Sequence, residues 1–294
     1  MEVKLIAYSQ APNGQKIATF ALEYPRFIHA ELMTHRVFSR NAQSSRAVPL
    51  RKSLSQPPVL PTSFGKNAPG MSSKEALSPL RTIFCKALWW STANGVRAAA
   101  FLMSKLGLHK QWANRPLEWQ QNIKVVVTST EWDNFFGLRL DSATVQPEMV
   151  ELAKAMKHEM DLSAPVQLQP GEWHLPYIDT YRNPVTGTLQ YFVDVDELTL
   201  AEAKTISVSC CAQVSYRNLD KNLYKAEQIL ARLADRDDPH LSPFEHQATP
   251  MVPYDEVGPI EGWEKGVTHM DKNAQFWSGN FCGFIQNRQL MENN

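Results

Sequence analysis

Hydrophobic and polar residues alternate along the start of the chain. Residues 2–9 and 16–24 show the two-residue period of half-buried strands. The dipeptide Asn13-Gly14 between them is typical of a tight hairpin turn, and Pro25 ends the second segment. The pattern predicts an antiparallel β-hairpin. A further buried strand is predicted over residues 123–127, which are short in extent and rich in β-branched side chains.

Apolar residues at helical spacing mark much of the remaining chain. Helices are predicted over residues 27–33, 73–106, 130–140, 147–160, 198–216 and 219–234. Within the second of these, the apolar positions from Leu80 to Leu106 suit one long helix or two consecutive helices, buried in the protein. Thr130 followed by Asp133 resembles a capping box at the start of the third helix.

Proline and glycine mark the irregular segments. Residues 53–72 contain four prolines and two glycines and predict an irregular surface excursion. Residues 165–187 are rich in turn-forming residues, and the last 50 residues are rich in loops. This order of elements favours a single α+β domain over residues 1–294, with a mixed or antiparallel sheet and flanking helices. A separate second domain remains an alternative.

The composition excludes some classes of partner. Lys and Arg number 30, as do Asp and Glu, so the chain has no net charge that would hold a nucleic-acid polymer or an anionic membrane. No apolar run reaches the roughly 18 residues of a membrane span. None of the four cysteines forms a C-x-x-C pair, and no signal peptide is recognisable. We therefore expect a cytoplasmic protein with reduced thiols.

The densest group of polar side chains lies between Thr34 and Arg46. Three guanidiniums, an imidazole, hydroxyls and amides occur within these thirteen residues. Such a segment offers forked donors for phosphate and further donors for the carbonyl oxygens of a heterocycle. The alternative is a solvated basic loop. That alternative does not explain why His35 and Arg36 follow directly on an apolar helix. The segment itself is expected to form a turn or loop, because Asn41, Ser44 and Ser45 are weak helix formers.

Three other segments carry candidate chemistry. Asn134 and Arg139 lie in an otherwise aromatic and aliphatic helix, where a partly buried Arg needs an anionic partner. Asp133 or Asp141 could be that partner in a purely structural ion pair. The segment from His240 to His246 includes two His and a Glu, but its spacing matches no common metal site, and we expect no metal. Arg115 is the last candidate, with a surface salt bridge as its alternative.

Familiar catalytic signatures are missing from the sequence. It contains no Gly-rich phosphate loop and no G-x-S-x-G elbow. Nucleophilic catalysis by a side chain is therefore poorly supported, and a cofactor is the more plausible carrier of the chemistry.

The candidate segments together resemble one family, the flavin-dependent thymidylate synthases. The run His35-Arg36-x-x-Ser39-x-Asn41-x-x-Ser44-x-Arg46 resembles the family's R-H-R-x-x-S-x-N-E-x-S-x-R-Y signature. The run Asn134-x-x-x-Leu138-Arg139-x-Asp141 resembles its N-F-x-x-L-R-x-D segment, and His240-x-Ser242-Pro243-Phe244-Glu245-His246 resembles its H-x-[ST]-P-F-E-H element. The resemblance covers most of the chain except residues 50–75 and 163–197. The absence of a cysteine in a Pro-Cys-His setting agrees with it, since that setting belongs to the thiol-dependent thymidylate synthases.

The order of the motifs differs from the family's order. The F-E-H element precedes the R-H-R element in the family, whereas here it follows by about two hundred residues. Residues 209–216, which are similar to an N-terminal region of the family, are displaced in the same way. The simplest explanation is a circular permutation, which exposed and neighbouring chain ends tolerate.

The resemblance implies FAD as cofactor, dUMP as substrate, and methylenetetrahydrofolate and NADPH as co-substrates. It assigns contacts with the flavin to His35, Arg36, Ser39, Asn41, Asn134 and His246. It assigns the nucleotide to Ser44, Arg46, Arg115 and Arg139. Arg139 would be the catalytic residue, a fixed cation that stabilises negative charge developing on the pyrimidine ring. The family also implies a homotetramer with active sites shared between subunits.

Three positions depart from the family pattern. Thr34 stands where the family has Arg, Ala42 where it has Glu, and Ala47 where it has Tyr. Gln286 and Arg288 are candidates for restoring an amide and a cation from another direction. These changes leave three alternatives to thymidylate formation: hydroxymethylation of dUMP or dCMP, a protein that binds flavin without turnover, and a non-catalytic nucleic-acid-binding protein.

Overall fold

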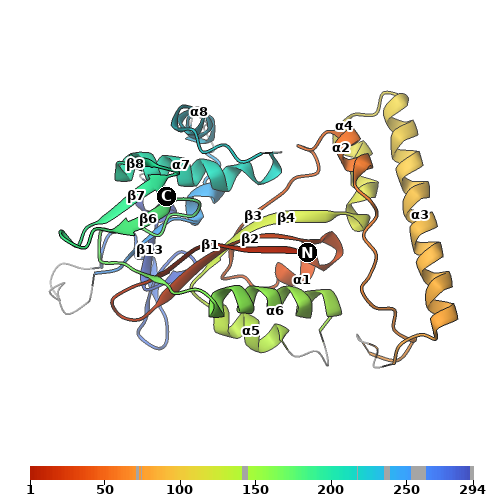
Figure 1. The fold of residues 1–294 in the computed structure, drawn as a ribbon, viewed down its shortest axis with the longest axis horizontal. Coiled ribbons are helices and arrows are strands. Elements are labelled where there is room, and N and C mark those ends of the chain that lie inside the picture. The colour runs from red at the N-terminus through yellow and green to blue at the C-terminus, as the bar shows by residue number, and fades with distance from the viewer. Residues whose placement is uncertain are drawn as a thin grey trace.

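The computed structural model describes residues 1–70, 73, 75–140, 145–216, 218–234, 239–252 and 263–291 (Figure 1). In this part of the chain the central sheet has five strands, in the order β3-β4-β2-β1-β5. They are β1 (Glu2–Gln10), β2 (Lys16–Pro25), β3 (Ser39–Ala42), β4 (Asn122–Ser129) and β5 (Val166–Gln167). The first four pair antiparallel, and β5 pairs parallel with β1. The predicted hairpin and the predicted strand over 123–127 are confirmed, and the α+β class agrees with the structure.

The two faces of this sheet differ in chemistry, because neighbouring residues of a strand point to opposite sides. One face is apolar and packs against α1 (His29–Leu32), α5 (Trp132–Arg139) and α6 (Pro147–Asp161). Its buried side chains include Phe20, Leu22, Ile123, Val125 and Val127. Figure 1 shows α5 and α6 along one side of β1 and β2.

The opposite face carries hydroxyl and amide side chains. Thr128 of β4 lies between Thr19 of β2 and Ser39 of β3 in the strand register, so these three share one face. Asn41 shares this face two residues further along β3. Helices of the C-terminal half cover it, namely α7 (Leu200–Ala212), the 3-10 helix η3 (Gln213–Ser215) and the 3-10 helix η4 (Ser242–Glu245). The helix α8 (Leu223–Ala234) packs on α7. The polar side of the sheet is therefore enclosed by residues that lie far away in the sequence.

The other elements are short. They are η1 (Arg26–Ile28), α2 (Leu50–Ser55), α4 (Lys110–Ala113), η2 (Arg115–Gln120), β6 (Asp179–Arg182), β7 (Leu189–Val193), β8 (Asp196–Leu198), β9 (Ala248–Pro250), β10 (His269–Met270), β11 (Phe276–Ser278), β12 (Phe281–Cys282), β13 (Phe284–Gln286) and η5 (Asn287–Leu290). The strands β6, β7 and β8 form one small sheet, β10, β11 and β12 another, and β9 pairs with β13. The predicted excursion over 53–72 begins inside α2, and its last two residues lie outside the described part.

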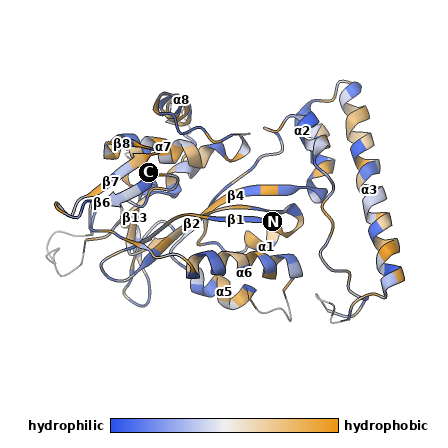
Figure 2. Cartoon of the chain, in the orientation of Figure 1, coloured by the Kyte–Doolittle hydropathy of each residue, from blue (hydrophilic) through white to orange (hydrophobic). Residues whose placement is uncertain are grey.

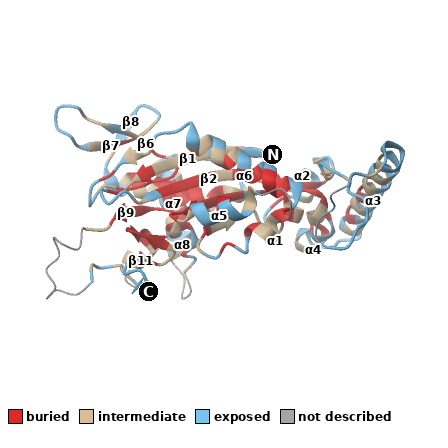
Figure 3. Cartoon of the chain, turned by 90° about the horizontal axis from the view of Figure 1, so that it is seen from below, coloured by how far each residue is buried: buried red, intermediate tan, exposed pale blue. Residues whose placement is uncertain are grey.

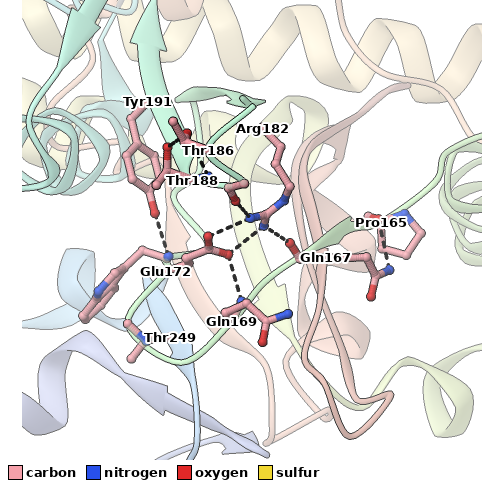
Figure 4. Close-up of polar contacts among 12 residues, drawn as sticks. Pro165, Gln167, Gln169, Glu172, Arg182, Thr186, Thr188, Tyr191 and Thr249 are labelled. Atoms are coloured by element: carbon pink, nitrogen blue, oxygen red, sulfur yellow. Dashed lines mark hydrogen bonds and ion pairs between the residues drawn. The ribbon is translucent and has the colours of Figure 1, made fainter. Parts of the chain in front are cut away.

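An ion pair fastens the small β6–β8 sheet to the segment that follows β5 (Figure 4). Two guanidinium nitrogens of Arg182 bind the two carboxylate oxygens of Glu172, at 2.9 and 2.7 Å. The same guanidinium also donates to the carbonyl oxygens of Gln167 and Gly187, each at 2.6 Å. The hydroxyl of Tyr191 accepts a hydrogen bond from the backbone N–H of Trp173 at 2.8 Å. These contacts hold the segment 167–175 against the rest of the fold.

The long helix α3 (Pro79–Lys105) differs from the prediction in its start and in its burial. It begins at Pro79 rather than Ser73, because proline is favoured in the first helical turn and lacks the N–H that an earlier turn would need. Only Ala93 and Ala100 of the helix are buried. Figure 3 shows α3 largely exposed at one end of the molecule, and Figure 2 shows hydrophobic residues along it. The expectation of a helix buried within the chain is wrong.

Two local expectations also fail. The segment predicted as a turn or loop contains β3, because Ser39–Ala42 pair with β4, and pairing overrides the weak intrinsic preference of Ser and Asn. Thr130 does not cap α5; the N-cap is Glu131, without a side-chain hydrogen bond. The hydroxyl of Thr130 instead accepts a hydrogen bond from the backbone N–H of Cys282 at 3.0 Å.

Candidate active site

The first group of candidate residues lies on the polar face of the central sheet. Ser39 Oγ accepts a hydrogen bond from Gln286 Nε2 at 3.1 Å, and the same amide donates to the Glu245 carbonyl at 3.0 Å. His246 Nδ1 lies 2.8 Å from the hydroxyl of Thr128, the register partner of Ser39. Two predicted flavin contacts, Ser39 and His246, are thus 207 positions apart in the sequence yet bound to neighbouring groups.

Arg288 joins this group through its ion pair with Glu245. The structure therefore places both Gln286 and Arg288 beside the F-E-H element, where the sequence suggested an amide and a cation from another direction. His246 has no exposed surface, and its Nε2 has no hydrogen-bond partner among the described residues. Burial lowers the pKa of His246 to about 3, so the ring is neutral at physiological pH. A ligand reaches this ring only when the side chains that enclose it move.

The second group joins α1, the start of the signature and α5. Arg139 Nε donates to His35 Nε2 at 2.9 Å, and its two terminal nitrogens bind Glu31 Oε1 at 2.5 Å and Thr34 Oγ1 at 3.0 Å. His35 is 6% exposed and packs between the rings of Phe38 and Phe135, with centroid distances of 5.4 and 4.9 Å. Arg139 therefore has an anionic partner, Glu31, which sequence reasoning did not identify.

The protonation state of His35 follows from these contacts. Burial, and then the nearby Arg139 and Arg40 cations, lower the pKa of His35 to about 4. Because Arg139 Nε always donates, His35 Nε2 must accept, and the single proton of the neutral ring sits on Nδ1. The sequence partner considered for Arg139, Asp141, lies outside the described residues. The other one, Asp133, is exposed and forms no ion pair with Arg139 in the described chain.

A third group connects the signature to the helices above the sheet. Asn41 Nδ2 donates to the Cys211 carbonyl at 3.0 Å, and the backbone N–H of Ser44 donates to Ser215 Oγ at 3.0 Å. Asn41 and Ser44 thus face the end of α7 and the helix η3. This is the region whose sequence is similar to the N-terminal part of the family.

The remaining predicted residues lie at the surface. Arg36, Arg46 and Asn134 are exposed and make no hydrogen bond or ion pair with the described residues. Arg115 pairs with Glu118 at 2.9 Å, and that carboxylate also accepts from Ser45 Oγ at 2.5 Å. The surface ion pair considered for Arg115 is therefore present. The structure does not bring these four side chains into direct contact with His35, Ser39 or His246.

Two hollows of the described surface border the central sheet. One, of about 500 Å³, opens on the polar face of the sheet between β1, β2, β4 and the segment 213–221. Three cations, Lys4, Lys124 and Lys221, line it, and none of the residues predicted for the site does. Another, of about 750 Å³, lies between the β1–β2 turn and the strands β10–β12. No group of three or more His, Cys, Asp or Glu in the described chain could hold a metal ion.

The candidate residues include hydrogen-bond donors, exposed guanidiniums and neutral imidazoles, and groups of these kinds bind phosphorylated heterocycles. The family model of the thymidylate synthase complementing proteins matches residues 11–166, more than half of the 294-residue chain. The chain therefore belongs to that family, the flavin-dependent thymidylate synthases. A comparison with curated protein sequences finds no match. Family membership indicates a thymidylate synthase-type enzyme of nucleotide biosynthesis. Within the described residues no helix is long and apolar enough to cross a membrane.

Proposed function

We propose that the protein is a cytoplasmic, FAD-dependent enzyme that transfers the carbon of methylenetetrahydrofolate to C5 of dUMP and forms dTMP with NADPH as reductant. The observation that carries the proposal is the convergence of Ser39 and His246 on one face of the sheet. These residues belong to two motifs that resemble the family, and Thr128 and Gln286 connect them. The family match over residues 11–166 supports the same proposed function.

The residues present fit a flavin dinucleotide in their chemistry. Arg36 and Arg46 are exposed guanidiniums near the signature strand, suited to phosphate oxygens. His246 Nε2 is a buried polar atom without a hydrogen-bond partner in the described chain, and a bound ligand could supply that partner. When bound, reduced flavin supplies a hydride. The chain's own residues would bind and orient the isoalloxazine through Ser39, Asn41, Asn134 and His246, with His35 and Arg36 alongside.

Arg139 is the residue that we assign to the pyrimidine. Its side chain is 17% exposed, and Glu31, His35 and Thr34 fix all three guanidinium nitrogens. A cation held in this way needs little reorganisation when negative charge develops on a pyrimidine oxygen. The hydroxyl of Thr34 is one of these three partners. Thr34 stands where the family has Arg, so at this position a hydroxyl group helps to position Arg139. Ser44, Arg46 and Arg115 would hold the rest of the nucleotide.

We further propose that the chain is one domain in which the family's elements are circularly permuted. Asn41 and Ser44 of the signature contact Cys211 and Ser215, and η4 lies against β3. These contacts join the first 50 residues to residues 209–246, which the family would place before the signature. An experimental structure superposed on a family member tests the idea: residues 199–250 should coincide with that member's N-terminal elements, and a different location would contradict it.

The exposed side of α3 supports the proposed homotetramer. Leu80, Phe84 and Leu88 recur every four residues and are 62–67% exposed, and Leu102 is 60% exposed on the same helix. Trp89 holds the opposite side to the body, since its indole N–H donates to the Val59 carbonyl at 3.0 Å. A helix of 27 residues is about 40 Å long, and an apolar stripe of that length marks a protein interface. We propose that a second copy of the chain covers this apolar stripe.

One experiment separates the proposed reaction from its alternatives. The purified protein is incubated with FAD, methylenetetrahydrofolate, NADPH and either dUMP or dCMP, and the products are identified by mass spectrometry. We expect dTMP from dUMP. A hydroxymethyl product without dTMP, or turnover of dCMP alone, would replace the proposed product or substrate. Bound flavin without any turnover would mean a non-catalytic relative, and oligonucleotide binding by a colourless protein would contradict the flavoenzyme altogether.

A further inference from the structure

The register of β2 and β4 brings two short helices together where these strands meet them. Pro25, the last residue of β2, pairs with Asn122, the first residue of β4. Arg26 follows directly and opens η1, and its backbone N–H donates to the Gln121 carbonyl at 2.8 Å. The helix η2 ends just before this point, so η1 and η2 lie side by side although they are far apart in the sequence. The charged side chains of the two helices therefore meet.

Three donors meet at a single carboxylate oxygen in this group. Glu118 Oε1 lies 2.9 Å from Arg115 Nη1 and 3.3 Å from Arg26 Nη2. The same oxygen accepts a hydrogen bond from Ser45 Oγ at 2.5 Å. The other oxygen, Oε2, has no hydrogen-bond partner in the described chain. A carboxylate oxygen has two lone pairs, so the donors outnumber the acceptor sites on Oε1 while those of Oε2 stay unused.

The ion pair between Arg182 and Glu172 shows how a well-matched pair looks in the same fold (Figure 4). There, both carboxylate oxygens of Glu172 are bound by guanidinium nitrogens, at 2.9 and 2.7 Å. This fork-on-fork geometry is the strong form of the interaction. Arg26 and Arg115 instead meet at one oxygen of Glu118. A guanidinium has five N–H donors, so Glu118 leaves most of the donors of these two side chains without an anionic partner.

Charge and burial favour a further anion at this place. Two guanidiniums share one carboxylate, and neither forms a second ion pair within the described residues. The side chain of Arg26 is 19% exposed and that of Arg115 is 48% exposed, so the donors extend from the interior to the solvent. Burial, and then the Arg26 and Arg40 cations, lower the pKa of His29 below its usual value. The positive charge of this group is therefore only partly neutralised by Glu118.

The hydroxyl of Ser45 is held in place without the help of Glu118. Asn114 Nδ2 donates to the carbonyl oxygens of Ser45 and Val48, each at 2.8 Å, and Asn114 is only 1% exposed. The side chain of Glu118 is 23% exposed and can turn towards the solvent. If it does, the two guanidiniums and the hydroxyl remain as a preformed set of donors.

We propose that Arg26, Ser45 and Arg115 form the binding site of a phosphate monoester, and that Glu118 is a resident carboxylate that the phosphate displaces. A phosphate monoester has three terminal oxygens and up to two negative charges, so the guanidiniums and the hydroxyl can each bind a different oxygen. Arg26, Ser45 and Glu118 are not among the residues that the family resemblance assigns. The identity of the ligand as dUMP rests on the function proposed above, whereas the anion site itself does not.

Inorganic phosphate is the probe that tests the anion site directly. Its binding to the purified full-length protein and to variants is measured by isothermal titration calorimetry. Arg26→Gln removes one guanidinium and should weaken phosphate binding about tenfold, the effect of one charge-assisted contact. Glu118→Gln keeps the shape of the side chain but removes the competing negative charge, so phosphate should bind several-fold more tightly. A purely structural Glu118 predicts no gain in affinity for this variant.

A matched control and a second variant keep the test decisive. Glu172→Gln removes the same charge from the ion pair with Arg182 and should leave phosphate affinity unchanged. If Arg26→Gln fails to fold, the more exposed Arg115→Gln replaces it, with the same expected loss. Phosphate affinity in Glu118→Gln that is equal to or weaker than that of the wild type would overturn the proposal. So would wild-type affinity in Arg26→Gln or its substitute.

Steady-state kinetics with dUMP connect the anion site to the proposed reaction. Arg26→Gln should raise the KM for dUMP about tenfold with little change in kcat, because the phosphate is remote from the reacting C5 atom. Glu118→Gln should lower the KM. A protein that binds phosphate as expected but does not convert dUMP would contradict the proposed function alone. Conversion of dUMP with the same KM in the wild type, Arg26→Gln and Glu118→Gln would contradict the anion site alone.

Discussion

The two fully buried histidines, His174 and His246, make the folding free energy depend on pH. Both have a pKa of about 3 in the folded protein, against about 6.5 in an unfolded chain. Between these values the unfolded chain binds more protons than the folded protein. Their stabilising contribution is therefore complete above pH 6.5 and is lost as the pH falls towards 3.

The size of the effect follows from the same values. On going from pH 7 to pH 5, each of these histidines costs about 2 kcal/mol of stability. His35, with a pKa of about 4, costs about as much, so the three together cost about 6 kcal/mol. That is a large part of the 5–15 kcal/mol that is typical for a domain. The assay is urea unfolding followed by tryptophan fluorescence, at several pH values between 7 and 5.

A variant shows whether these histidines are the cause. His246→Gln removes one of three titrating groups and should reduce the loss between pH 7 and pH 5 by about a third. His240→Gln is the control, since His240 is exposed in the same segment. A wild-type unfolding free energy that stays constant between pH 7 and pH 5 would refute the reasoning. So would a His246→Gln protein that loses as much stability as the wild type.

Four further predictions concern individual contacts. Arg139→Ala should abolish turnover and leave flavin bound, with a stability loss of about 1–3 kcal/mol because Glu31 loses its partner; near-normal activity would remove Arg139 from the site. Arg46→Ala should raise the KM for the nucleotide at least several-fold without changing the melting temperature, since Arg46 is exposed and unpaired in the described chain. Arg182→Ala should destabilise the fold by about 1–2 kcal/mol and leave flavin affinity unchanged, as measured by urea unfolding and FAD titration. Leu88→Glu should shift the light-scattering mass towards the monomer, whereas Val185→Glu, a control at an even more exposed apolar residue, should not.

The local parts of the fold could be predicted from the sequence. The β1–β2 hairpin depends on alternation and on the Asn13-Gly14 turn, and Gly14 has the positive φ of +85° that such a turn requires. The helix α6 follows from its amphipathic spacing, and its observed bounds, Pro147–Asp161, agree with the prediction to within one residue. Both signals lie within about 25 residues of sequence, so no distant partner is needed to read them.

Features that depend on distant partners could not be predicted. The strand β3 exists because β4 lies about 85 residues further on and offers an edge, while its own residues favour a loop. The apolar stripe of α3 has the same spacing as that of a helix buried in a core, so periodicity alone does not say what covers it.

The candidate site shows the same division. Its donors were recognisable from the signature, whereas the partners that fix them come from elsewhere: Glu31 for Arg139, Glu118 for Arg115 and Thr128 for His246. Gln286 and Arg288 were suggested by their residue types, and only the structure shows that they meet Ser39 and Glu245. Side-chain chemistry was readable from the sequence, but the pairing of side chains was not.

The visible absorption spectrum of the purified protein tests the central claim most directly. We predict the bands of an oxidised flavin, bleached by NADPH under anaerobic conditions and perturbed when dUMP is added. A colourless protein that takes up no FAD, and whose spectrum does not respond to dUMP or dCMP in its presence, would contradict the account.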